Sequence, residues 1–96
     1  MKSVRIAGID YSIDVCDPSQ MQDVGRLGEA DFNRQAIRIN NTVTEQTKQI
    51  ATIHEVLHMI DHAYGTKLNE EQVVILTHGL VQFVKDNRLF FNNVIG

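Results

Sequence analysis

The feature that most restricts the fold of this chain is a stretch of about twenty residues with helix-capping signals at both ends. Thr44 is a good N-cap residue, and Glu45 follows it in the first turn, where the helix dipole favours an acid. Gly65 is a natural stop, because glycine adopts the left-handed conformation that ends many helices. These signals predict a helix over residues 45–64. Apolar residues recur within it at steps of three and four and are expected to face the core: Ile50, Ile53, Leu57, Ile60 and Tyr64.

Inside this predicted helix the chain reads His54-Glu55-Val56-Leu57-His58, an HExxH motif. Two histidines four residues apart project from one side of a helix and can bind one Zn²⁺ at about 2.0–2.1 Å. The acid after the first histidine can contact a water molecule on the metal and act as the general base of a hydrolysis. Angular placement at about 100° per residue puts both histidines at the border of the apolar stripe. Glu55 lies nearly opposite the stripe and is expected to be solvated unless it lines a cleft.

A second helix is predicted over residues 70–86. Asn69 is its N-cap residue, and Gln72 stands where a capping box needs it. Its expected apolar stripe consists of Val73, Leu76, Leu80 and Val84. Residues 88–96 are too apolar for a solvated tail, so they are expected to pack onto the sheet or onto another subunit.

A catalytic zinc site of this kind needs a third protein ligand. Glu70 lies on the inward edge of the second helix, whereas Glu71 faces water, so Glu70 is the preferred ligand. If the two helices formed a simple antiparallel hairpin, Glu70 and His58 would lie at different heights along the helix axes. Residues 65–69 can nevertheless run back along the first helix, since five extended residues span about 16 Å. Glu71 stays open as a ligand, as do His78 and Asp61. Asp61 can instead orient an imidazole ring or cap nearby polar groups.

The first forty residues show the alternation of short strands, over about residues 3–39. One hairpin is expected to turn at Gly8-Ile9-Asp10 and a second, from Leu27 to Ile39, at Asn33-Arg34-Gln35. Arg38 is expected to be a solvated charge. The predicted fold class is α+β, with a small, mostly antiparallel sheet packed against two helices in a single domain over residues 1–96, and with the metal site on the first helix.

Composition excludes several classes of function. The chain has 96 residues and a formal net charge of −3, which argues against general affinity for nucleic acid. No stretch approaches the roughly 18 uncharged apolar residues of a membrane span, and the acids and glycine near the N-terminus are not typical of a secretory signal. The single cysteine, Cys16, suits a reducing compartment. We therefore expect a cytoplasmic protein, with its oligomeric state undetermined by the sequence.

Several segments are similar to a known family: GIDY at 8–11, GEADF at 28–32, QAIRI at 35–39, QTKQIATIHEVLH at 46–58, LNEEQV at 68–73 and KDN at 85–87. The chain resembles the small phage- and prophage-encoded proteins related to the ImmA/IrrE metallopeptidases, a minimal zincin-like group. The resemblance implies Zn²⁺ bound by His54 and His58, a general base at Glu55 and a downstream acid, matched by Glu70, as third ligand. It also implies a protein or peptide substrate, or a regulatory protein as partner, in a bacterium or a phage-infected cell. Because zincins commonly hold an extended peptide along an edge strand, residues 36–40 are expected to be that edge.

Three functions are consistent with this sequence. The first is a zinc metallopeptidase-like domain that hydrolyses a peptide bond. The second is a catalytically silent, zincin-like phage accessory protein that binds zinc for stability or binds a partner. The third is a metal-free helical interaction module in which the two histidines and the glutamate are ordinary surface residues.

Overall fold

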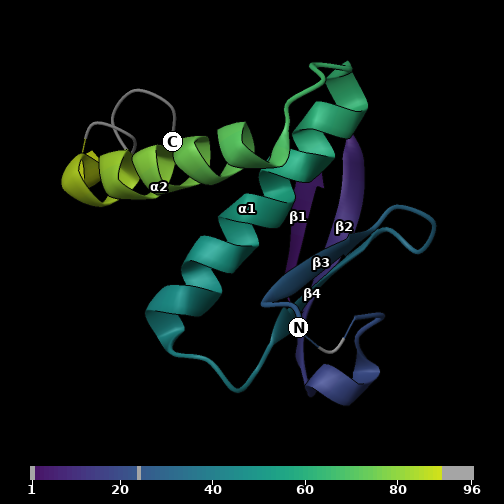
Figure 1. Ribbon diagram of the computed structural model, residues 1–96. Coiled ribbons are helices and arrows are strands. Elements are labelled where there is room, and N and C mark those ends of the chain that lie inside the picture. Colours follow the sequence, from purple (N-terminus) through teal and green to yellow (C-terminus); the bar gives the residue numbers. More distant parts are fainter. Residues whose placement is uncertain (1, 24, 90–96) are drawn as a thin grey trace.

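The computed structural model describes residues 2–23 and 25–89. Within them the chain forms a four-stranded mixed sheet and two helices, an α+β fold. Helix α1 lies across one face of the sheet, and α2 crosses α1 and extends away from the sheet (Figure 1). The elements in chain order are β1 (Lys2–Ile6), β2 (Ile9–Cys16), the short 3₁₀ turn η1 (Pro18–Gln20), β3 (Gly28–Asp31), β4 (Ala36–Asn40), α1 (Glu45–Tyr64) and α2 (Glu70–Asp86).

The sheet has the strand order β1-β2-β4-β3. Its two antiparallel pairs, β1 with β2 and β3 with β4, are the hairpins that the alternation predicts. The pair that joins them, β2 with β4, is parallel, and the expectation of a mostly antiparallel sheet did not anticipate it. Strand β4 therefore has a neighbour on each side, and the prediction that residues 36–40 form an edge is wrong. The edge strand beside β4 is β3.

Helix α1 has the predicted caps. The Thr44 side chain accepts a hydrogen bond from the Thr47 N–H, and Gly65 ends the helix in the left-handed conformation at φ 66°. The buried face differs from the predicted stripe: it contains Glu55, and Tyr64 is 68% exposed. The difference arises because α1 packs against two partners. Ala51 and Met59, which are not part of the predicted stripe, join the core over the sheet. Three members of the stripe instead line a groove shared with α2: Ile53, Leu57 and Ile60.

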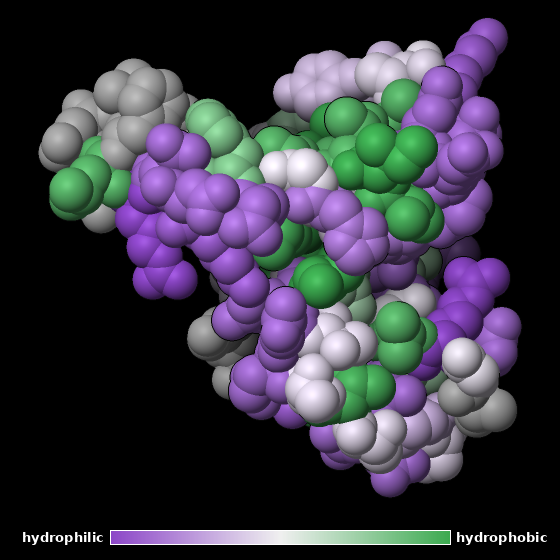
Figure 2. Space-filling view, turned by 60° about the vertical axis from the view of Figure 1, so that its left-hand side comes forward, coloured by the Kyte–Doolittle hydropathy of each residue, from purple (hydrophilic) through white to green (hydrophobic). Residues whose placement is uncertain are grey.

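Helix α2 begins with the predicted capping box, in which Asn69 and Gln72 exchange side-chain-to-backbone hydrogen bonds. Only Val73 and Thr77 of α2 are buried. The other members of its predicted stripe stay partly exposed: Leu76, Leu80 and Val84. Figure 2 shows hydrophobic surface gathered in the middle of one face of the molecule, with hydrophilic side chains around it. Of the apolar segment at 88–96, residues 90–96 lie outside the described residues, and Leu89 is exposed.

Arg38 is not the solvated charge that the sequence suggested. Its side chain is 12% exposed and donates to the carboxylates of Glu29 and Asp31, at 2.7 Å in each case. Glu29 also accepts hydrogen bonds from the backbone N–H of Gln22, at 2.9 Å. Residues of a strand alternate between its two faces, so this charged network lies on the side of the sheet opposite α1. It links β4 to β3 and to the loop before β3.

None of the described helices is long and apolar enough to cross a membrane.

Candidate metal centre

Helix α1 presents the two histidines of the motif one turn apart on a half-buried face. The Nε2 atoms of His54 and His58 are 3.1 Å apart, and their ring centroids are separated by 4.8 Å. The side chains are 20% and 30% exposed, respectively. The rings are therefore accessible from a cleft while the helix backbone that carries them is packed on the sheet.

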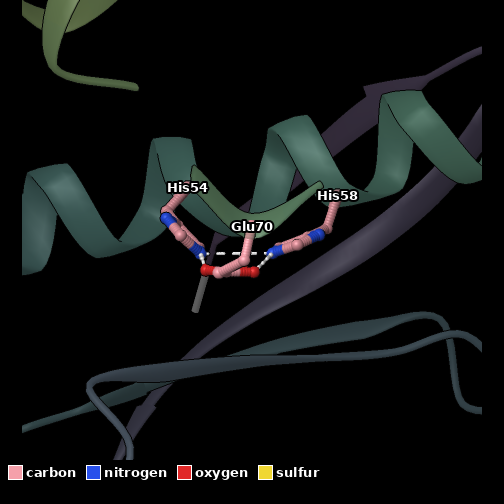
Figure 3. Close-up of side chains that lie close together, drawn as sticks. All are labelled: His54, His58 and Glu70. Carbon is pink, nitrogen blue, oxygen red and sulfur yellow. Dashed lines mark hydrogen bonds and ion pairs between the residues drawn. The ribbon is translucent and has the colours of Figure 1, made fainter. Parts of the chain in front are cut away.

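Glu70, the first residue of α2, meets both rings. Its Oε1 lies 2.7 Å from Nε2 of His54, and its Oε2 lies 3.1 Å from Nε2 of His58. Figure 3 shows the two rings and the carboxylate pointing toward one another. One donor atom from each of the three residues lies within 4.8 Å of the others. The connection between the helices therefore runs back along α1, as it must for this acid to reach the histidines.

The donor set suits a transition-metal ion such as Zn²⁺. Metal–ligand distances of about 2.0–2.2 Å place the ligands of a tetrahedral zinc site about 3.3 Å apart. Two of the separations found here, at 3.1 Å, are close to that value, and the third, at 2.7 Å between Glu70 and His54, is shorter. In the part of the chain that the structure describes, no further histidine, cysteine or acid joins these three residues as a fourth donor. Three protein ligands and one free position is the ligand count typical of catalytic zinc sites, whereas structural sites have four.

Glu55 is buried beside this group and lines the same cleft as His54, His58 and Glu70. Among the described residues, its carboxylate has no hydrogen-bond partner. Burial raises the pKa of Glu55 above its usual value, and the negative charge of Glu70 adds to the rise, while His58 and Arg26 oppose it. The sequence left two environments for Glu55, bulk water or a cleft, and in the structure Glu55 lines a cleft. A buried carboxylate that faces a cleft can accept a proton from a molecule bound there.

The cleft has a volume of about 810 Å³, within the usual range of ligand sites. The two helices form one wall and the edge strand β3 the other. From the strand side it is lined by Gly28 and Ala30, which share a face of β3, and by Phe32 just beyond. A bound molecule can therefore lie between strand β3 and the donor group.

The competing metal ligands considered from the sequence do not belong to the donor group. Glu71 is exposed, and His78 lines the cleft without joining the donor group. The Asp61 carboxylate accepts hydrogen bonds from the Thr66 hydroxyl and from the Leu68 N–H, so it contacts the connection between the helices instead of an imidazole.

Sequence reasoning missed the contribution of the strand wall. A Cβ built on Gly28 would lie 3.3 Å from Cγ of Glu55, so the strand approaches the motif closely at a residue without a side chain. Arg26 also lines the cleft. Alternating small residues in the GEAD segment are the only sequence signal that could have indicated this close packing.

Comparisons of the chain with protein-family models, curated proteins and solved structures give no match. A function must therefore be argued from the site itself.

Proposed function

We propose that this chain is a zincin-like, zinc-dependent metallopeptidase domain that hydrolyses a peptide bond of a protein or peptide substrate. In this proposal His54, His58 and Glu70 hold the metal and Glu55 is the catalytic general base. The resemblance to the ImmA/IrrE metallopeptidases supports the assignment and suggests the cytoplasm of a bacterium or of a phage-infected cell as the place of action.

The convergence of Glu70 on the two histidines carries the proposal. Glu70 comes from a different helix and is 64% exposed, yet its two oxygens lie 2.7 and 3.1 Å from the two imidazole nitrogens. An exposed side chain that ends between two other donors matches what a shared metal ion requires. An ordinary ion pair with a surface histidine would account for contact with one ring, whereas Glu70 ends between both rings. The metal-free interaction module is therefore the least favoured function.

Glu55 supplies the proton transfers. Zn²⁺ in this site would polarise the substrate carbonyl and lower the pKa of a water molecule. The Glu55 carboxylate takes the proton of the attacking water and gives it to the leaving amine as the C–N bond breaks. The raised pKa of Glu55 makes its carboxylate a stronger base for the first of these transfers.

Strand β3 supplies a binding edge for an extended peptide. Among the described strands it pairs with β4 alone, and its residues Gly28 and Ala30 line the cleft. An extended substrate can hydrogen-bond to such an edge as an additional strand.

The test is a comparison of zinc content and hydrolysis in matched variants. Protein loaded with one equivalent of zinc sulfate and desalted is analysed for metal, and a defined peptide library is searched for cleavage by mass spectrometry. Glu55→Gln should retain zinc and lose hydrolysis. Glu70→Ala should bind zinc at least tenfold more weakly. Glu71→Ala removes the same charge from the same helix turn, and it should change neither.

Two outcomes would contradict the proposal in different ways. Retention of less than a tenth of an equivalent of zinc by the unaltered protein would remove the metal site. Full zinc retention without cleavage of any library member, or with equal cleavage by Glu55→Gln, would remove the peptidase and favour the catalytically silent zinc-binding module.

A further inference from the structure

The position of Glu70 depends on the five residues that connect α1 to α2. If α2 simply folded back along α1, Glu70 would not be level with His58. The connection instead brings Glu70 back to the two histidines. The Glu70 side chain is 64% exposed, so little of it is covered by other residues. Something other than packing around Glu70 must therefore fix where α2 begins.

Asp61 makes the contacts that fix this connection. Its main-chain oxygen accepts hydrogen bonds from the N–H groups of Gly65, at 2.8 Å, and Thr66, at 3.4 Å. Its carboxylate accepts a hydrogen bond from the Thr66 hydroxyl and another, at 2.9 Å, from the N–H of Leu68. One residue of α1 thus binds donors at the first, second and fourth positions of the connection. Asp61 lies three residues after His58, on the same rigid helix.

The backbone of the connection needs such support. Lys67 has φ 60°, the left-handed conformation that residues with a side chain rarely adopt. The bond from Leu68 to the Asp61 carboxylate follows directly after this residue. The next residue, Asn69, is the N-cap of α2, so Glu70 begins only two residues after the bonded Leu68. The hydrogen bonds to Thr66 and Leu68 also hold the pKa of Asp61 below its usual value, so the carboxylate is charged at neutral pH.

We propose that Asp61 is a positioning residue for the third metal ligand: by fixing the connection at Thr66 and Leu68, it sets Glu70 against His54 and His58. This inference rests on the proposed metal site. Asp61 does not itself belong to the donor group. Its effect on metal binding therefore passes through Glu70.

A double-mutant cycle tests this route. Zinc affinity is measured by competition with a chromophoric chelator for the unaltered protein, Asp61→Ala, Glu70→Ala and the double variant. Asp61→Ala should weaken zinc binding at least tenfold when Glu70 is present and less than twofold when Glu70 is absent. A direct ligand or a general loss of folding would weaken binding in both backgrounds. Equal weakening in both, or none in either, would overturn the inference.

Further variants keep the test decisive if Asp61→Ala folds poorly. Asp61→Asn keeps the size and one acceptor oxygen, and Thr66→Val removes only one donor; both should weaken zinc binding by less than Asp61→Ala. The visible spectrum of the Co²⁺-loaded Asp61→Ala protein should match that of Co²⁺-loaded Glu70→Ala, and a spectrum like that of the unaltered protein would count against the inference.

Failure of the unaltered protein to retain zinc would remove the metal site and this role of Asp61 together, whereas normal zinc affinity in Asp61→Ala would remove only the role of Asp61.

Discussion

Gly28 faces Glu55 so closely that a Cβ built on Gly28 would lie 3.3 Å from Cγ of Glu55. The same Cβ would lie 3.1 Å from Cδ1 of Ile39, which is completely buried. The absence of a side chain at Gly28 thus allows the edge strand to lie against the proposed general base. The wall of the cleft therefore limits where the side chain of the proposed general base can lie.

Gly28→Ala should therefore impair catalysis more than metal binding. Ile39 is completely buried in the core whereas Glu55 lines the cleft, so we expect the Glu55 side chain to shift and admit the methyl group. A misplacement of about 1 Å at a reacting group can lower the rate about 100-fold, and a smaller shift lowers it less. We expect kcat/KM for a peptide substrate to fall at least tenfold while zinc content stays at one equivalent.

Gly25→Ala is the matched control for this substitution. A Cβ built on Gly25 would meet only the Asp23 carboxylate, at an ordinary 3.6 Å. This variant should keep both zinc and activity. An unchanged kcat/KM in Gly28→Ala would show that the contact does not constrain Glu55.

Arg38→Met should destabilise the fold without a direct effect on the donor group. The substitution keeps the length of the side chain but leaves the carboxylates of Glu29 and Asp31 without their cation. Both acids are buried, at 3% and 6% exposure, and breaking a buried ion pair from one side is costly. Urea unfolding should show a free energy of unfolding lower by about 2–3 kcal/mol.

An exposed pair provides the comparison for Arg38. Arg5 and Asp10 form an ion pair in which the side chains are 66% and 68% exposed. Such pairs contribute little, so Arg5→Met should leave the urea midpoint almost unchanged. A similar small effect of Arg38→Met would mean that the network around Arg38 is no more important than a surface pair.

The helices and their ends could be predicted because their signals are local. Thr44, Gly65 and Asn69 cap their helices through bonds to residues at most four positions away. The two hairpins were also predictable, since alternation and turn residues act over short stretches. The parallel pairing of β2 with β4 was not, because nothing within either hairpin specifies which strands of the two become neighbours.

In the candidate site, too, the features set by local geometry were predictable and those set by tertiary contacts were not. The spacing of His54 and His58 follows from helix geometry alone. The burial of Glu55 does not, because the apolar stripe indicates one packing face and α1 has two, one toward the sheet and one toward α2. The approach of Glu70 depends on hydrogen bonds from the connection to Asp61, which capping and periodicity do not reveal. The charge pairing of Glu29 with Arg38 depends on the register of the β3–β4 hairpin, in which the two residues are cross-strand partners, and the turn prediction alone did not specify that register.

The last prediction concerns the pH dependence of stability. Burial acts to raise the pKa of Glu29, but hydrogen bonds from the Gln22 N–H, Arg38 and the Asp23 N–H outweigh it, and the pKa lies below its usual value of 4.5. The unfolded chain therefore binds a proton at a higher pH than the folded one. The stabilisation by Glu29 is complete above pH 4.5 and is lost as the pH falls through the lower pKa of the folded state.

Glu29→Gln should flatten this acid-side loss. We expect the metal-free protein, measured by urea unfolding in a chelator between pH 6 and pH 3, to lose stability steeply below about pH 4.5. Glu29→Gln should be less stable at pH 6, because Arg38 loses a charged partner, and should lose less on acidification. Glu45→Gln changes an acid whose side chain is 84% exposed and should keep the steep loss. Parallel curves for Glu29→Gln and the unaltered protein would show that the Glu29 carboxylate is not held in its charged form by the fold.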